Sequence, residues 1–266
     1  TGIGGIGGVC LNWGCIPSKS LLKNAELVNT LQSADEWGLS FDNFSTDISK
    51  AIDRSRKVSS TLTQGIGYLF RQNKIELLRG AGALTSATSV QVEDGPVLTA
   101  KKVVISTGAR PSSLPGLEID GEKVITSRQA LETRETPKAI GIIGGGAIGV
   151  EFAYFFRSYG ADVSVFEMLP HIVPTEDEEV GIELERAFKK QGIKTVTRSR
   201  VSGATERDGR MVISYEVDGE EAEYVCDKVL VAVGVKANSD NLGLESAGVG
   251  VDERGFIEIG EQMRTN

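Results

Sequence analysis

The sequence of 266 residues has a single histidine, only three cysteines and no excess of positive charge. Lysine and arginine together number 29 against 37 aspartates and glutamates, which gives a net charge of −8. This balance argues against a general nucleic-acid surface and against an anchor to anionic membranes. No apolar run approaches the roughly 18–20 residues of a transmembrane helix, and no signal-peptide pattern is present. Because the chain begins at Thr1, this says nothing of a leader that has been removed.

The scarcity of cysteine and histidine also limits the metal chemistry that the chain can support. Cys10 and Cys15 lie five positions apart among glycines. A zinc site would need two further ligands, and only Cys226 and His171 remain, both in distant contexts, so we expect no metal site. Three cysteines with two in a close pair suit a reducing compartment, the cytoplasm or an organelle matrix, better than a disulfide-stapled secreted fold.

The spacing of the close pair constrains how it could form a disulfide. Five residues advance roughly 7.5 Å along a regular helix, whereas a disulfide joins Cα atoms about 4.4–6.8 Å apart. A bond between Cys10 and Cys15 therefore needs a distorted turn, for which Gly14 offers backbone freedom. Closing so short a loop contributes only about 2 kcal/mol. That suits a pair that opens and closes better than a structural staple.

Apolar residues at helical spacing predict a helix over residues 17–31. Cys15 would then lie at or just before the helix N-terminus, where the helix dipole and Lys19 favour the thiolate over the thiol. The alternatives are two unreactive core cysteines, or a disulfide with a structural or regulatory role.

A second motif lies in the middle of the chain. Residues 139–143 are expected to form a buried strand, residues 150–159 a helix and residues 161–166 the next strand. The loop between the first strand and the helix has the pattern G-x-G-x-x-G, and Glu167 closes the second strand. Strand, glycine loop, helix and acid together make the context of a Rossmann dinucleotide site.

The expected contacts of that site follow from its chemistry. The glycines allow close approach of a pyrophosphate, and the helix N-terminus supplies N–H groups. Glu167 would accept hydrogen bonds from an adenosine ribose diol and repel a 2′-phosphate. No arginine occurs from Met168 to Thr175, so NAD(H) is favoured over NADP(H). The residues of the loop expected to contact the dinucleotide are Gly144, Gly146, Ala147, Ile148 and Gly149.

The remaining pattern predicts further elements on both sides of a polar linker over residues 111–122, where we place the domain boundary. A long helix is expected over residues 47–73, although Gly65 and Gly67 could break it. An antiparallel meander with two Asp-Gly hairpin turns is expected after the second Rossmann strand. The short strands expected are 75–78, 83–84, 90–92, 102–105, 194–196, 201–204, 211–217, 221–225 and 228–233, and the further helices are 127–132 and 176–191.

The segment GGVCLNWGCIPSK, from Gly7 to Lys19, resembles the redox-active segment of the flavin-dependent pyridine nucleotide–disulfide oxidoreductases. It is most similar to the branch that oxidises dihydrolipoamide as the E3 component of 2-oxoacid dehydrogenase complexes, and the resemblance extends over essentially the whole chain. It implies an α/β fold with two Rossmann-like nucleotide-binding domains, of which the FAD domain is incomplete and the NAD domain is complete with its antiparallel meander. The implied parts are a partial FAD-binding domain with the redox-active disulfide (1–116), an NAD(H)-binding domain (117–245) and a segment that returns to the FAD domain (246–266).

The resemblance also implies roles for individual residues. Cys10 would be the interchange thiol and Cys15 the thiol that faces the flavin, while Lys19 would tune the flavin and pair with Glu151. Val201 and the backbone of Gly234 would contact NAD, although Val235 and Ala237 depart from the arginine and proline that the family usually has in this turn. The residues expected beside FAD are Gly8, Val9, Gly14, Gly82, Ser106, Thr107 and Gly108.

The implied activity passes electrons from dihydrolipoamide through the Cys10–Cys15 disulfide and FAD to NAD⁺. Partners would be dihydrolipoamide or a lipoyl domain and, for a longer parent protein, a second copy in a homodimer; nucleic acid and membrane are not expected. A complete family member also has an N-terminal FAD fingerprint and a C-terminal interface domain with a His–Glu pair, which we do not find here. The alternatives are a glutathione- or mercuric-type reductase and a non-catalytic NAD(H)-binding fragment.

Overall fold

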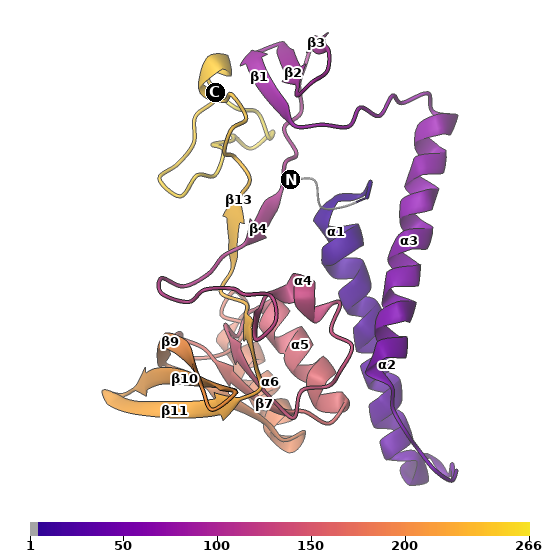
Figure 1. Cartoon of the computed structure of the whole chain (residues 1–266), viewed down its shortest axis with the longest axis vertical. Helices are drawn as coiled ribbons and strands as arrows, with labels where there is room; N and C mark the ends of the chain where they lie inside the picture. The colour runs from indigo at the N-terminus through magenta and orange to yellow at the C-terminus, as the bar shows by residue number, and fades with distance from the viewer. Residues whose placement is uncertain (1–4) are drawn as a thin grey trace. The chain divides into compact units, whose positions relative to one another are not determined.

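The computed structural model describes residues 5–266, which divide into two compact units. The large unit consists of residues 10–62 and 111–234. The small unit consists of the residues before Cys10 together with residues 63–110 and 235–266. Figure 1 follows the chain through both units from indigo to yellow. The expected FAD-binding part over residues 1–116 begins with residues 1–4, which lie outside the described residues.

The centre of the large unit is a parallel sheet with strand order β5-β12-β6-β7-β8. In this register Ile142 of β6 lies opposite Leu230 of β12 and Val165 of β7, and all three are fully buried. Strands covered on both faces read as continuous apolar runs, which is the pattern that predicted them. Its strands are β5 (Val124–Ile125), β6 (Ala139–Ile143), β7 (Asp162–Phe166), β8 (Ile193–Val196) and β12 (Lys228–Val231).

Helices pack on this sheet through apolar stripes. The most apolar of them, α5, buries Phe152, Phe155 and Phe156, and these rings join the core formed by the sheet. Thr126 caps α4 in a capping box with Gln129. The bounds are α4 (Ser127–Ala130), α5 (Ala147–Ser158) and α6 (Glu178–Lys190).

An antiparallel meander in the order β11-β10-β9 packs against the same sheet (Figure 1). Its two hairpins turn at Asp208-Gly209 and Asp218-Gly219, all four with positive φ, as type I′ turns require. The approach to the sheet is close: a Cβ built on Gly141 of β6 would lie 2.2 Å from Ile213 Cδ1 of the meander. The strands are β9 (Ser199–Arg207), β10 (Arg210–Val217) and β11 (Glu220–Cys226).

Within residues 5–266, three α-helices and one 3₁₀ helix precede this sheet in the chain. The first two, α1 (Gly8–Trp13) and α2 (Cys15–Gln32), are separated only by Gly14, and a 3₁₀ helix η1 (Ala34–Trp37) follows. The third, α3 (Ile48–Gln72), runs without a break, because Gly65 and Gly67 keep negative φ values. The break that these glycines could have caused is therefore absent. Arg54 and Ser55 of α3 bond α2 at Ser20 and Pro17 respectively.

The small unit contains a three-stranded antiparallel sheet, β1-β2-β3, and the pair β13-β4. The expected strands at 75–78 and 102–105 do not form, and within residues 5–266 no strand pairs with either segment. Most of their side chains are exposed, with Val104 at 84%, while Val103 and Ile105 are half-buried. A β-type run without a partner strand has nothing to hold it in a ladder. The observed elements are β1 (Gly82–Ser86), β2 (Ser89–Val92), β3 (Val97–Thr99), β4 (Ala109–Pro111), β13 (Val235–Ala237) and η2 (Glu245–Ala247).

Among the helices of residues 5–266, none has the length and apolarity needed to cross a membrane. The absence of a long apolar run in the sequence agrees with this result.

Candidate functional site

The two close cysteines occupy adjacent helices. Cys10 lies in α1 and Cys15 is the first residue of α2. Gly14 between them leaves helical geometry, with φ −142° and ψ −118°, and α2 then begins with the bond from Ser18 N to Gly14 O at 3.1 Å. The expected break at Gly14 is thus confirmed. Both cysteines are exposed free thiols in this structure.

The acidity of Cys15 differs from the expectation. The hydrogen bond with the Cys10 side chain, followed by partial burial and the charge of Cys10, raises the pKa of the Cys15 thiol above its ordinary value. A backbone hydrogen bond at the helix start and the charge of Lys19 act in the opposite direction but do not prevail. The predicted effect of the helix start and of Lys19 is therefore present in direction but is outweighed in the reduced pair, because a thiol that donates to a neighbouring thiolate holds its proton more tightly.

This coupling gives a pH-dependent prediction. In a Cys10→Ala chain we expect the pKa of Cys15 to fall, because the largest cause of its elevation is removed while Lys19 remains. Alkylation of Cys15 by iodoacetamide at neutral pH should then accelerate several-fold, since the thiolate is the nucleophile. The pH–rate profile, followed by mass spectrometry of the cysteine peptide, measures the shift. A profile that keeps the wild-type midpoint would contradict the coupling.

Lys19 and Glu151 connect the dithiol helix to the glycine-loop helix. Lys19 lies one helical turn after Cys15 on α2 and donates from Nζ to Glu151 Oε1 on α5. The side chain of Lys19 is 62% exposed and that of Glu151 25%, so the pair is partly screened by solvent. The predicted contact is confirmed, and it joins the segment that carries Cys15 to the helix that begins at the glycine loop.

The glycine loop between β6 and α5 has the close packing that its pattern indicates. Gly144 has φ +107°, and a Cβ there would lie 2.4 Å from Ala232 O; a Cβ on Gly149 would lie 1.9 Å from Gly144 O. Gly146 is the N-cap of α5 and has open space around its Cβ position. Gly144 and Gly149 therefore allow the tight turn, and Gly146 leaves room for a ligand at the N-terminus of the twelve-residue helix α5.

Glu167 directly follows β7 beside this loop and is almost completely buried. Its Oε2 accepts the Gly145 N–H at 2.7 Å and its Oε1 accepts the Leu169 N–H at 2.9 Å. These bonds hold the carboxylate in one orientation, and each oxygen keeps a lone pair for a further donor. The geometry is consistent with the expected ribose contact and adds a loop-holding role that the sequence did not indicate.

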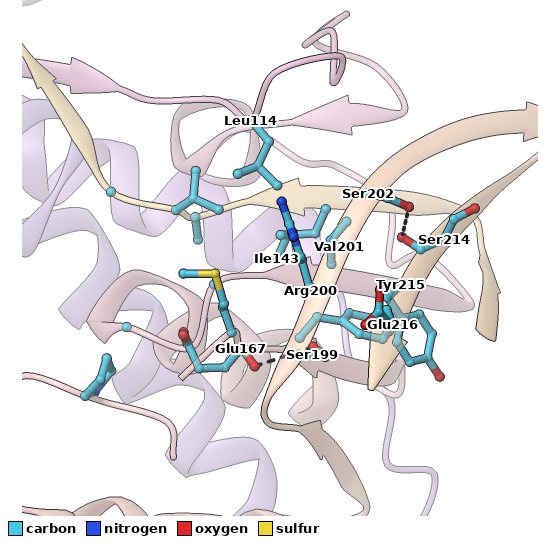
Figure 2. A pocket seen from close by; sticks show the side chains of 18 of the residues that line it. Leu114, Ile143, Glu167, Ser199, Arg200, Val201, Ser202, Ser214, Tyr215 and Glu216 are labelled. Atoms are coloured by element: carbon cyan, nitrogen blue, oxygen red, sulfur yellow. Dashed lines mark hydrogen bonds between the residues drawn. The ribbon is translucent and has the colours of Figure 1, made fainter. Parts of the chain in front are cut away.

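A cavity of about 1620 Å³ opens between the glycine loop and the meander, wholly within the large unit. Figure 2 shows Glu167, Arg200, Val201 and Tyr215 around this space. Gly149 is not among the lining residues, because it packs beneath the loop on Gly144. The predicted residues that line the cavity are Gly144, Gly146, Ala147, Ile148, Glu167, Val201 and Gly234.

The cavity also contains residues that the sequence analysis missed. Arg200 and Tyr215 come from β9 and β10, and Met168 follows Glu167. Arg200 lies outside residues 168–175, the stretch whose lack of arginine favoured NAD(H). The meander pattern could have indicated it: Arg200 directly precedes Val201 on a strand expected beside the adenine. Arg200 brings a positive charge to a cavity whose other charged lining residues are Glu167, Glu216, Glu221 and Glu223.

The residues expected beside FAD are distributed over both units. In the small unit Asn238 holds the turn after residue 105, with its N–H bonded to Gly108 O at 3.0 Å and its Nδ2 to Thr107 O at 3.0 Å. Gly108 has φ +70° and open space at its Cβ position. Gly82 starts β1, where Val90 already fills the space beside it. Gly8 and Val9 are exposed in α1, and Ser106 lies in the turn. A flavin role for these residues stays a prediction.

The third cysteine and the histidine belong to the packing of the large unit. Cys226 is fully buried and joins the core under the meander, as expected, and burial raises its pKa to about 11. His171 Nδ1 lies 3.1 Å from Ile172 O, and the ring packs on Gly181. Among the described residues no cluster of three or more metal-ligating side chains occurs. Neither residue contributes to the dithiol turn.

Together these features define a class of protein. An exposed dithiol at a helix start, tied by an ion pair to the helix of a dinucleotide-type glycine loop, is the arrangement of a thiol–disulfide oxidoreductase that works with a nucleotide cofactor. The sheet, loop and meander give it an α/β fold.

Comparison with known proteins gives the family. The chain belongs to the family described as pyridine nucleotide-disulphide oxidoreductase, whose profile matches residues 1–266. Curated relatives include the dihydrolipoyl dehydrogenase of Zymomonas mobilis, 41% identical over 98% of this chain and 57% of the relative. That of Chlorobaculum tepidum is 40% identical over 98% of this chain and 56% of the relative. The chain thus spans about half the length of the curated relatives it matches.

A solved structure supports the same fold. The Cu(II) complex of the HOCl-induced flavoprotein disulfide reductase RclA from Escherichia coli matches with a TM-score of 0.82 at 27% identity. The match covers 97% of this chain and 55% of that chain. The family resemblance and the α/β fold inferred from the sequence are therefore confirmed, and FAD and NAD(H) are the cofactors of this class.

Proposed function

We propose that the protein oxidises dihydrolipoamide, or a lipoyl group on a partner domain, and passes the electrons to NAD⁺. The observation that carries this proposal is the connection of two exposed thiols, through Lys19 and Glu151, to the helix of the glycine loop. The relatives named dihydrolipoyl dehydrogenase give the substrate class. A homodimer of a longer parent protein, working within a 2-oxoacid dehydrogenase complex, belongs to the same proposal.

The exchange starts from the oxidised pair. A substrate thiolate attacks Cys10 Sγ of the Cys10–Cys15 disulfide, and Cys15 leaves as a thiolate. The second substrate thiol then displaces Cys10, which yields lipoamide and the reduced pair. Exposure does not distinguish the two cysteines. The attack is assigned to Cys10 because Lys19 stabilises the negative charge on Cys15 as Cys15 leaves. The net reaction converts dihydrolipoamide and NAD⁺ into lipoamide, NADH and a proton.

The residues present fit a pyridine nucleotide. The open position at Gly146 and the positive-φ backbone of Gly234 leave main-chain groups accessible in the cavity. The α5 N-terminus would hold the pyrophosphate, Glu167 the ribose diol and Val201 the adenine.

The flavin assignment rests on different features. FAD is a cofactor of this family and would supply a two-electron relay between the exposed thiols and the nucleotide. We retain residues 1–116, 117–245 and 246–266 as the proposed FAD part, NAD(H) domain and return segment.

A second candidate function is a non-catalytic NAD(H)-binding module. It is favoured by the cavity, whose lining residues run from Leu114 to Gly234 and all belong to the large unit. Such a module would bind NADH and leave the thiols untouched.

The test is a visible absorption spectrum of the purified chain after loading with FAD and removal of free flavin. We expect a bound-flavin spectrum, and anaerobic addition of NADH to the oxidised protein should generate two new thiols per chain. A protein that binds NADH but stays colourless, or gains no thiols, would refute the electron-transfer proposal and favour the binding module.

A further inference from the structure

The chain between the two cysteines passes through a single junction. Trp13 ends α1, which carries Cys10, and α2 starts at Cys15 after the break at Gly14. How closely the two sulfur atoms can approach is therefore decided by whatever fixes the direction of α1 relative to α2. The ring of Trp13 packs against the main core of the large unit. Contacts to this ring can therefore fix the direction of α1.

Two arginines from distant parts of the sequence hold this ring. The guanidinium carbon of Arg56 on α3 lies 4.8 Å from the ring centroid of Trp13, and that of Arg128 on α4 lies 4.4 Å from it. Both distances are within the roughly 6 Å over which a cation is attracted to an aromatic face. Helices α3 and α4 are thereby attached to the junction. We call Arg56, Trp13 and Arg128 the arginine clamp.

Arg56 also holds the backbone of the junction. Its Nη1 donates to Asn12 O at 2.7 Å, one residue before Trp13. Its Nε and Nη2 are buried without a hydrogen-bond acceptor, and burial lowers its pKa. Unpaired buried donors oppose folding, so an apolar side chain would serve packing alone better than a guanidinium. The arginine supplies what an apolar residue cannot: a planar cation for the ring and a donor for the carbonyl.

We propose that the arginine clamp positions the redox turn so that Cys10 and Cys15 meet, and thereby favours closure of their disulfide. The clamp acts through the geometry of α1, so its members are positioning residues. This inference rests on the proposed function, in which the pair cycles between two thiols and one disulfide. Closure removes two electrons and two protons from the pair.

The test is the equilibrium of the pair with glutathione. The oxidant is glutathione disulfide, which accepts the two electrons and becomes two glutathione thiols. The disulfide fraction of the purified 266-residue chain is measured by quenching, alkylation and mass spectrometry across a series of glutathione ratios. For Arg128→Gln and for Trp13→Leu we expect the equilibrium constant to shift about tenfold toward the dithiol, which is about 30 mV for this two-electron couple. Arg128→Lys should recover most of the shift, because an ammonium group also binds the ring face.

Arg54→Gln is the matched control. Arg54 lies on the same helix, α3, and bonds Ser20 and Asn24 of α2 rather than the junction. Its replacement removes one positive charge, as Arg128→Gln does, at a position two residues from Arg56. We expect the glutathione equilibrium to stay unchanged. Thermal unfolding of each variant, measured in parallel, separates a loss of fold from a loss of positioning. If the Trp13→Leu chain does not fold, the result for Arg128→Gln alone tests the proposal.

The outcomes distinguish the clamp from the proposed function. Folded Arg128→Gln and Trp13→Leu chains with the wild-type equilibrium would overturn the clamp and leave the redox pair in place. An equal shift in Arg54→Gln would also overturn it, because the effect would then be one of charge. A wild-type chain that forms no disulfide at any glutathione ratio would overturn the proposed function together with the clamp.

Discussion

Under the proposed function, Cys15→Ser in the longer parent protein should lower dihydrolipoamide oxidation by at least about a thousandfold, because a serine hydroxyl is not ionised at neutral pH and cannot form the disulfide. NADH affinity should stay within about twofold of wild type, since the nucleotide cavity is built from residues 114–234 and excludes Cys15. Turnover is followed by NADH absorbance and NADH binding by fluorescence titration.

The matched control for that substitution is Cys226→Ala. It removes a thiol that is buried in the core away from the dithiol turn, and we expect turnover to be retained. Lipoamide turnover that survives in Cys15→Ser would show that the pair is not the route of the electrons. Retained NADH binding with lost turnover would place Cys15 in the chemistry and leave the nucleotide site intact.

A Gly149→Ala chain should show the opposite defect. The new Cβ would lie 1.9 Å from Gly144 O, a backbone atom that cannot rotate away, so the glycine loop has to move. Overpacking of this kind costs about 3 kcal/mol or more when the backbone must shift. NADH affinity should fall about a hundredfold, or about 2.7 kcal/mol, while the alkylation rates of Cys10 and Cys15 stay near wild type.

Gly203→Ala serves as the control for Gly149→Ala. Gly203 lies in β9 of the same unit, has open space at its Cβ position and does not line the cavity. We expect NADH affinity and the unfolding temperature to stay close to wild type. Isothermal titration of NADH and thermal unfolding measure both effects. Wild-type NADH affinity in Gly149→Ala would show that the loop is not the pyrophosphate site.

The elements that the sequence predicted best are those whose local signals agree with their burial. The strand over residues 139–143 matches its prediction to the residue, because an apolar run followed by a glycine loop has one favourable solution in a parallel sheet. The two Asp-Gly turns of the meander are also where they were predicted, although β9 covers residues 199–207 rather than 201–204. The contact between Lys19 and Glu151, 132 positions apart, came from the family resemblance and not from any local pattern.

The failures have a common physical cause, which is that tertiary partners decide the outcome. Residues 75–78 have strand-like composition, yet a strand needs a ladder partner, and sequence periodicity does not supply one. The pKa of Cys15 was misjudged because its hydrogen bond with Cys10 depends on the geometry at Gly14. Arg200 was missed because the position of the meander over the cavity is a property of the fold.

The order of strands in the large unit has a consequence for synthesis of the chain. β12 lies between β5 and β6, although it follows both of them by about ninety residues or more. During translation the inner edge of β6 therefore stays unpaired until residue 231 has emerged from the ribosome. An apolar strand with a free edge is a template for association with other chains. Nascent chains that stall within the meander should consequently be the species most prone to aggregate and most dependent on chaperones.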